Sequence, residues 1–187
     1  MNEKNRFENR KQPEPKIITV DQEEGWKITK APNIIEATGL GPCVGVIVYD
    51  PESKQAMVGH FIDPVANNLQ GMLDEAVKRF PNISKLKIYV GGGAPEPDDA
   101  PHFTDDRAKR AFVKKQLEDH EFLNSQITTN YHNSNDATTM RIDTSTGNVE
   151  YNEESYWDDK YDEDDYKSNN NKYDEENHLD DEDDYNH

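Results

Sequence analysis

The fold of this chain is decided by one stretch, which reads Thr38-Gly39-Leu40-Gly41-Pro42-Cys43-Val44-Gly45-Val46-Ile47-Val48-Tyr49, then Asp50-Pro51-Glu52-Ser53, then Gln55-Ala56-Met57-Val58-Gly59-His60-Phe61-Ile62. Two apolar runs rich in β-branched residues flank an Asp-Pro turn, and this pattern predicts a β-hairpin. A hairpin that is symmetric about the Pro51–Glu52 bond places Cys43 directly opposite His60, and a three-residue loop makes the pair diagonal. Opposite residues hold their Cβ atoms roughly 4.5–5.5 Å apart, so a thiol there can meet an imidazole.

This pairing makes Cys43 a candidate nucleophile. On its own, a lone cysteine at a strand edge is typical of a small buried hydrophobe. Two features favour chemistry instead: Gly39 and Gly41 let the backbone approach a substrate carbonyl, and His60 can act as a base that takes the thiol proton. Because Pro42 has no N–H, an oxyanion hole would use the N–H of Cys43 and a donor from another loop.

The remaining elements are predicted from periodicity. The run from Val44 to Tyr49 does not alternate with polar residues, which indicates a central strand covered on both faces. Further strands are predicted at residues 16–20, 26–29, 85–90, 126–131, 138–143 and 148–151. The last of these closes a hairpin, because a turn at residues 144–147 precedes it.

Two helices are predicted between these strands. Asn67 can cap the first, Pro81 stops it, and its apolar stripe consists of Leu69, Met72, Leu73, Ala76, Val77 and Phe80. The second should run from about residue 104 to 120, with a weaker stripe of Ala108, Ala111, Phe112 and Leu117. The order of strands, helix, strand, helix and strands indicates an α+β fold in which a mixed sheet is layered against two helices, not a doubly wound parallel fold.

Composition divides the chain into three segments, and charge separates the last of them. Of the net charge of −18, residues 152–187 carry −13 and the rest only −5. We therefore expect a disordered N-terminal segment at 1–15, a globular domain at 16–151 and a disordered acidic tail at 152–187. The tail could bind a basic protein partner, although its plainer role is to keep the domain in solution.

Composition also narrows the class of protein. Nucleic-acid binding is disfavoured, because phosphate contacts need clustered Lys and Arg. No secretory signal and no membrane-spanning stretch is expected, which with a single cysteine favours a soluble, cytoplasmic protein; export into a host cell is compatible with this expectation.

No metal or organic cofactor is predicted. The histidines at 102, 120 and 132 have no partner at metal-ligand spacing, and we expect all three to be exposed. The Gly91-Gly92-Gly93-Ala94 run does not match a phosphate-binding motif, and it is better explained as a tight loop. Gly92 and Gly93 could then line a cleft near the hairpin, together with Gly39 and Gly41.

The order of these motifs resembles the CheD family of bacterial deamidases, which hydrolyse glutamine side chains of chemoreceptors. The similarity covers roughly residues 33–151. The matching motifs are Gly39-Leu40-Gly41-Pro42-Cys43-Val44, Tyr49-Asp50-Pro51, Gly59-His60-Phe61, Lys87-Ile88-Tyr89-Val90-Gly91-Gly92-Gly93-Ala94 and Ile142-Asp143-Thr144-Ser145-Thr146-Gly147. Cytotoxic necrotizing factor toxins have the same Cys–His arrangement, and residues 43–107 also look something like eukaryotic protein N-terminal asparagine amidohydrolase.

The resemblance implies an α-β-β layered sandwich and a Cys–His deamidase that needs no cofactor. Cys43 and His60 fall where the catalytic pair of the family does. The family's threonine six residues before the cysteine is Ala37 here, so Thr38 is the candidate for the third catalytic residue. Pro42 replaces a serine, and residues 133–136 replace a Gly-Arg segment.

The implied substrate is a protein that carries the target Gln or Asn. Three alternatives stay open: an inactive adaptor that keeps the fold and binds partners, an enzyme like the N-terminal asparagine amidohydrolase, and a transglutaminating enzyme in which an amine replaces water.

Overall fold

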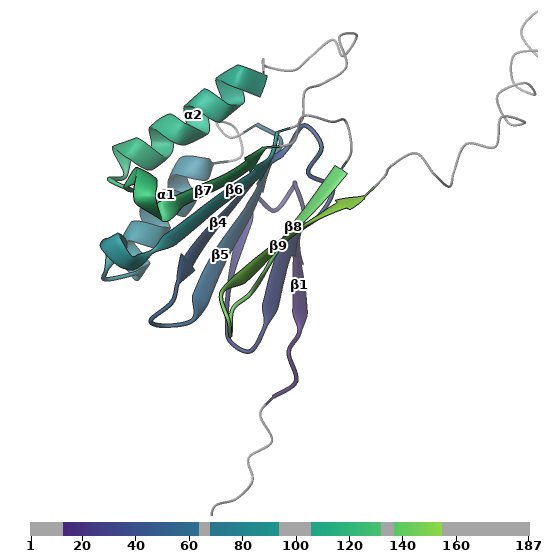
Figure 1. Cartoon of the computed structure of the whole chain (residues 1–187), viewed down its shortest axis with the longest axis vertical. Helices are drawn as coiled ribbons and strands as arrows, with labels where there is room; N and C mark the ends of the chain where they lie inside the picture. Colours follow the sequence, from purple (N-terminus) through teal and green to yellow (C-terminus); the bar gives the residue numbers. More distant parts are fainter. Residues whose placement is uncertain (1–12, 64–67, 94–105, 132–136, 155–187) are drawn as a thin grey trace, which may run out of the picture. The chain divides into compact units, whose positions relative to one another are not determined.

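The computed structural model describes residues 13–63, 68–93, 106–131 and 137–154, and within them the chain forms nine strands and two α-helices (Figure 1). The strands are β1 (Ile17–Val20), β2 (Trp26–Lys30), β3 (Ile34–Ala37), β4 (Val44–Asp50), β5 (Gln55–Phe61), β6 (Lys87–Gly92), β7 (Ile127–Tyr131), β8 (Ala137–Asp143) and β9 (Asn148–Glu154). The helices are α1 (Leu69–Arg79) and α2 (Asp106–Asp119), with short 3₁₀ turns η1 (Ile83–Lys85) and η2 (Asn124–Gln126). The predicted α+β class is confirmed.

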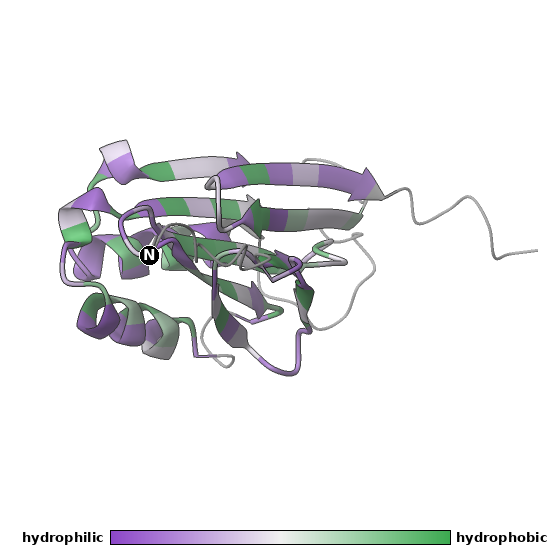
Figure 2. Cartoon of the chain, turned by 90° about the horizontal axis from the view of Figure 1, so that it is seen from below, coloured by the Kyte–Doolittle hydropathy of each residue, from purple (hydrophilic) through white to green (hydrophobic). Residues whose placement is uncertain are grey.

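The strands form two mixed sheets. The central sheet has the order β2-β5-β4-β6-β7, and the outer sheet has the order β1-β3-β8-β9. The β1–β3 and β6–β7 pairs are parallel, and the other pairs are antiparallel. Both helices lie against one face of the central sheet, while the outer sheet packs against its other face (Figures 1 and 2). The domain therefore has the α-β-β layers that the resemblance implies.

Strand β4 is the centre of this arrangement, because all seven of its residues are buried. Side chains alternate along a strand, so Val46 and Val48 pack toward the helices, whereas Ile47 and Tyr49 pack toward the outer sheet. Figure 2 shows hydrophobic segments gathered on the strands in the middle of the domain. The prediction of a strand covered on both faces is confirmed.

The register of the β4–β5 hairpin differs from the symmetric one that the sequence predicts. Gly45 pairs with His60, so residues 51–54 form a four-residue loop, and direct pairing of Cys43 with His60 is wrong. The physical reason is Lys54, which takes the left-handed conformation with a φ of 53° and lengthens the loop. The shift is two residues, which keeps Cys43 and His60 on the same face in diagonal positions.

The helices match their predicted extents with two corrections. Asn68, with a φ of 63°, caps α1 by accepting a hydrogen bond from the Gly71 N–H at 2.9 Å, and Asn67 lies outside the described residues. In α2, Ala108 and Ala111 were expected in the apolar stripe but are exposed. The buried positions include Val113 and Leu117. An alanine buries little surface, so the larger side chains set how the helix is rotated on the sheet.

Two strands run further than predicted. β6 includes Gly91 and Gly92, which the sequence assigned to a loop, and β9 continues to Glu154, three residues past the predicted end of the domain. The predictions for residues 1–12, 102, 132–136 and 155–187 lie outside the described residues. In the part of the chain that the structure describes, no helix has the length and apolar character needed to cross a membrane.

Candidate active site

Cys43 and His60 lie at one end of the layer between the two sheets. Cys43 directly precedes β4 and His60 is the sixth residue of β5, and both are buried, with exposed fractions of 4% and 5%. Cys43 packs in the cluster of side chains between the sheets, and His60 shares its face of β5 with Val58 of the same cluster. Cys43 comes two residues before Gly45, the ladder partner of His60, and a backbone separation of roughly 7–8 Å is typical of such diagonal neighbours.

The two ring nitrogens of His60 have different surroundings. Its Nδ1 lies 3.4 Å from the carbonyl oxygen of Val20, and because a carbonyl only accepts, this long hydrogen bond favours the proton on Nδ1. Its Nε2 then carries the lone pair, and that atom is buried without a hydrogen-bond partner among the described residues. Burial lowers the pKa of His60, an effect that the Val20 carbonyl and the charge of Asp21 partly offset. The lowered pKa favours the uncharged ring, which can accept a proton on Nε2.

His60 also holds both ends of the turn formed by residues 21–24. Besides the contact of its ring with Val20, its backbone N–H donates to the carbonyl of Gly25 at 2.8 Å. Inside the turn, the Glu24 carboxylate accepts from the N–H of Asp21 at 3.1 Å. These contacts are not predictable from the sequence, because contacts through backbone carbonyls leave no pattern of side chains.

Gln22 extends from this turn toward the candidate nucleophile. Its Oε1 lies 4.0 Å from Sγ of Cys43, a long contact in which the thiol donates. The side chain of Gln22 is exposed, so it lies on the solvent side of the buried thiol. Gln22 is a site residue that the sequence analysis missed.

The four glycines predicted to line a cleft divide into two pairs. Gly92 and Gly93 have φ values of +75° and +64°, and both pack on Cys43. A Cβ at Gly92 would lie 2.4 Å from the carbonyl oxygen of Cys43, which also accepts a 2.7 Å hydrogen bond from the N–H of Gly93. In contrast, a Cβ at Gly39 or Gly41 would meet nothing within 4 Å, although Gly39 has a φ of +71°. The first pair fixes the backbone of Cys43, and the second borders open space.

The structure locates two threonines near this end of the outer sheet. Thr38, the predicted third residue, directly follows β3 and is half-buried, and its hydroxyl makes no hydrogen bond to the described residues. Thr138 of β8 is fully buried, and its Oγ1 has no hydrogen-bond partner among the described residues. Thr138 lies on the same face of β8 as Met140, whose sulfur would be 3.1 Å from a Cβ placed on Gly45. Thr138 was missed because its burial depends on how the two sheets stack.

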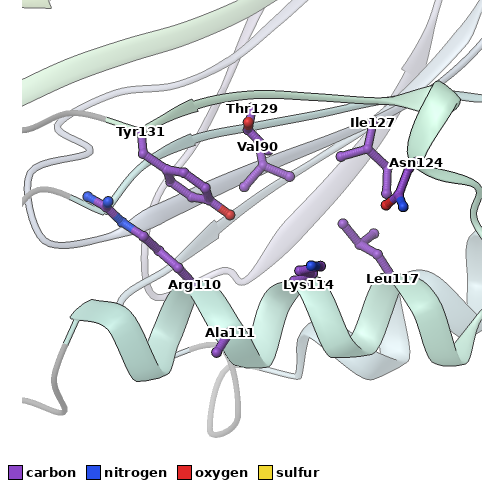
Figure 3. A pocket seen from close by; sticks show the side chains of 9 residues that line it. All are labelled: Val90, Arg110, Ala111, Lys114, Leu117, Asn124, Ile127, Thr129 and Tyr131. Atoms are coloured by element: carbon purple, nitrogen blue, oxygen red, sulfur yellow. The ribbon is translucent and has the colours of Figure 1, made fainter.

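Helix α2 supports the loops on either side of Cys43. The buried Lys109 donates from Nζ to the carbonyl of Pro42 at 3.3 Å, and Arg110 donates from Nη2 to the carbonyl of Gly93 at 2.6 Å. The Arg110 guanidinium lies over the Tyr131 ring, 4.6 Å from its centroid (Figure 3). Two cations of one helix therefore hold the carbonyl before Cys43 and the carbonyl of Gly93, whose N–H bonds to Cys43.

A cavity of about 430 Å³ lies between α2 and strands β6 and β7. It is lined by Val90, Arg110, Ala111, Lys114, Leu117, Asn124, Ile127, Thr129 and Tyr131 (Figure 3). Because Val90 faces the helices, this cavity is on the opposite face of the central sheet from the Cys43–His60 site. Arg110, which lines this cavity, also bonds to the carbonyl of Gly93 beside Cys43.

His120 is not exposed as predicted. Its side chain is 11% exposed, its Nε2 lies 2.9 Å from Oδ1 of Asp74, and its Nδ1 lies 2.6 Å from the carbonyl oxygen of Gln116. It therefore links α2 to α1. Within the described ranges, no group of three His, Cys, Asp or Glu side chains could hold a metal ion.

The curated proteins that are similar to this chain are named as chemoreceptor glutamine deamidases. No family model matches the chain. A probable chemoreceptor glutamine deamidase CheD from Caldanaerobacter subterraneus subsp. tengcongensis is 32% identical over 95 residues, which cover 43% of this chain and 58% of the relative. The protein of the same name from Desulfitobacterium hafniense is 32% identical over 81 residues, 36% of this chain and 51% of the relative. This chain thus spans about half the length of the curated relatives it matches.

Among solved structures, the crystal structure of the hypothetical protein YfiH from Bacillus licheniformis matches with a TM-score of 0.44 and 16% identity, covering 58% of this chain and 50% of that one. A likeness at this level carries no argument about the fold or the site. The likeness to the curated relatives, in contrast, agrees with the order of motifs in the sequence and with the α-β-β layers. Over that part of its length, the chain is similar to the CheD deamidases.

Proposed function

We propose that this protein hydrolyses the side-chain amide of a glutamine on a protein substrate, with Cys43 as the nucleophile and His60 as the base. The observation that carries the proposal is the buried Nε2 of His60, which has no hydrogen-bond partner among the described residues and lies on the same face as Cys43. Leaving a buried nitrogen without a partner costs about 1–3 kcal/mol, so a use for that lone pair is expected. The names of the curated relatives favour glutamine over asparagine.

The reaction follows from these roles. Nε2 of His60 takes the thiol proton, and Sγ of Cys43 attacks the amide carbon of the substrate. The imidazolium then gives its proton to the leaving ammonia, which leaves a thioester on Cys43. Water activated by the neutral His60 hydrolyses the thioester, and the products are a glutamate side chain and the free enzyme.

The backbone around Cys43 is held for this attack. Lys109 bonds to the carbonyl before the nucleophile, and Gly93 bonds to the carbonyl of the nucleophile itself. A positioned nucleophile loses less orientational freedom on reaching the transition state, which lowers the barrier. Thr38 and Thr138 are the hydroxyls available to orient the substrate amide.

The first test measures the reactivity of Cys43. The sequence has one cysteine, so the alkylation rate with iodoacetamide reports on Cys43 alone. We expect His60→Ala to slow alkylation near neutral pH by about tenfold or more. The matched control is His120→Ala, which removes a histidine bonded to Asp74 and should leave the rate unchanged. Equal rates in all three proteins would contradict the pairing of Cys43 with His60.

The second test measures the chemistry. Cell extracts from candidate hosts are incubated with the wild-type protein or with Cys43→Ser, and mass spectrometry locates glutamines converted to glutamate. Conversion that depends on Cys43 supports the enzyme, and no difference between the two proteins favours the adaptor. Addition of a primary amine distinguishes transglutamination, because it would give an amine adduct in place of the acid.

A further inference from the structure

The side chain of Gln22 presents to Cys43 the same group that the proposed reaction consumes. Its carboxamide oxygen is 4.0 Å from Sγ, and no other hydrogen bond of this carboxamide is made within the described part of the chain. A glutamine side chain elsewhere in the fold would have no such neighbour, because the sequence has a single thiol. The carboxamide is therefore near the candidate nucleophile and is not tied to another group.

The backbone that carries Gln22 is fixed relative to the base. The turn of residues 21–24 is bonded to His60 at both ends, through the carbonyls of Val20 and Gly25. Glu24 closes the turn internally through Asp21 and pairs with Nζ of Lys27 at 2.6 Å. The amide carbon of Gln22 is bonded to an oxygen 4.0 Å from Sγ, and rotation about the side-chain bonds is the motion that would bring it to the attack distance of roughly 3–3.5 Å.

We propose that Gln22 is a substrate of the protein's own active site and is converted to glutamate in cis. This inference deepens the proposed function and rests on it. Sγ of Cys43 forms a bond to the amide carbon of Gln22 as the thiol proton passes to His60. The C–N bond breaks, and the nitrogen leaves as ammonia with that proton. Water then cleaves the thioester, adding one oxygen atom to residue 22 and restoring the thiol, with no change in oxidation state.

The chain provides a clean readout for this reaction. Trypsin cleaves after Lys16 and Lys27, and the peptide of residues 17–27 contains Gln22 as its only glutamine and no asparagine. Any conversion of an amide to an acid in that peptide therefore belongs to residue 22. Glutamines far from the thiol, such as Gln70 of α1, report the rate of spontaneous conversion in the same sample.

The experiment follows this peptide over time after purification of the full chain and of Cys43→Ser, in water enriched with heavy oxygen. We expect the acid form to accumulate in the wild type with one heavy oxygen incorporated, and Cys43→Ser to stay at the level of Gln70. A wild-type peptide that keeps its glutamine would overturn the inference.

Two arms separate this result from its alternatives. If Gln22 persists while alkylation of Cys43 depends on His60, the inference fails and the proposed function stands; if neither is observed, both fail. Mixing the wild type with Cys43→Ser tests the cis requirement. Conversion of Gln22 in the Cys43→Ser chain would show transfer between molecules and would overturn the cis assignment.

Discussion

The two sides of the central sheet each contain a histidine, and the two are used differently. On the helix side, both ring nitrogens of His120 have partners, the Asp74 carboxylate and the Gln116 carbonyl. On the side of the outer sheet, Nδ1 of His60 has a long contact with Val20, and Nε2 has no partner among the described residues. A satisfied polar group is typical of structure, whereas an unsatisfied buried one needs another explanation.

The difference extends to the neighbouring polar groups. On the helix side, Lys109 and Arg110 are bonded to backbone carbonyls. Between the sheets, the hydroxyls of Thr138 and Tyr151 are buried without partners in the described ranges, and burial raises the pKa of Tyr151 to about 12. Among the described residues, buried polar atoms without a hydrogen bond therefore gather between the sheets, at His60, Thr138 and Tyr151. On the helix side the Nε atom of Arg110, whose Nη2 is bonded to Gly93, is of the same kind.

The largest effect is expected at Gly92, where the region around Cys43 depends on a close backbone contact. Gly92→Ala places a Cβ 2.4 Å from the carbonyl oxygen of Cys43 at a φ of +75°. We expect it to lower the free energy of unfolding by more than about 2 kcal/mol, measured by urea denaturation. The control is Gly41→Ala, whose Cβ would meet nothing within 4 Å and which should change stability little. Comparable losses in both variants would show that packing on Cys43 is not what requires a glycine.

A smaller effect of the opposite sign is expected at Thr138. Thr138→Val keeps the shape of the side chain and removes a fully buried hydroxyl that has no partner among the described residues. Stability should rise by about 1 kcal/mol, because the desolvated hydroxyl no longer has to be accommodated. If the hydroxyl orients substrate, turnover falls while the melting temperature rises. A loss of stability would show that Thr138 has a hydrogen bond in solution, and the contrast between the two regions would then be weaker.

The smallest effect concerns pH. Burial lowers the pKa of His60 below its ordinary value of 6.5, so the unfolded chain binds this proton more readily than the folded chain. Stability from His60 is therefore present above 6.5 and is lost as the pH falls from there toward the lowered folded pKa. His60→Gln should flatten this part of the profile of unfolding free energy against pH. An unchanged slope would mean that the ring is not desolvated.

Sequence patterns located the hairpin, the helices and the face that Cys43 shares with His60. They did not give the register, because Lys54 adopts a left-handed conformation that a non-glycine residue rarely takes. They did not give the support of Cys43 by Lys109 or the orientation of His60 by Val20. Both contacts are made to backbone carbonyls over long sequence separations, and every residue carries such a group.

The orientation of His60 by Val20 has a consequence for heat resistance. Val20 is the last residue of β1, a four-residue strand at the edge of the outer sheet whose ladder partner is β3. Short edge strands open at lower free energy than the centre of a sheet. As temperature rises, the hydrogen bond that sets the proton on Nδ1 is lost with this strand, while β4 and β5 remain paired. We therefore expect the effect of His60 on the alkylation rate of Cys43 to be lost at temperatures at which the core is still folded.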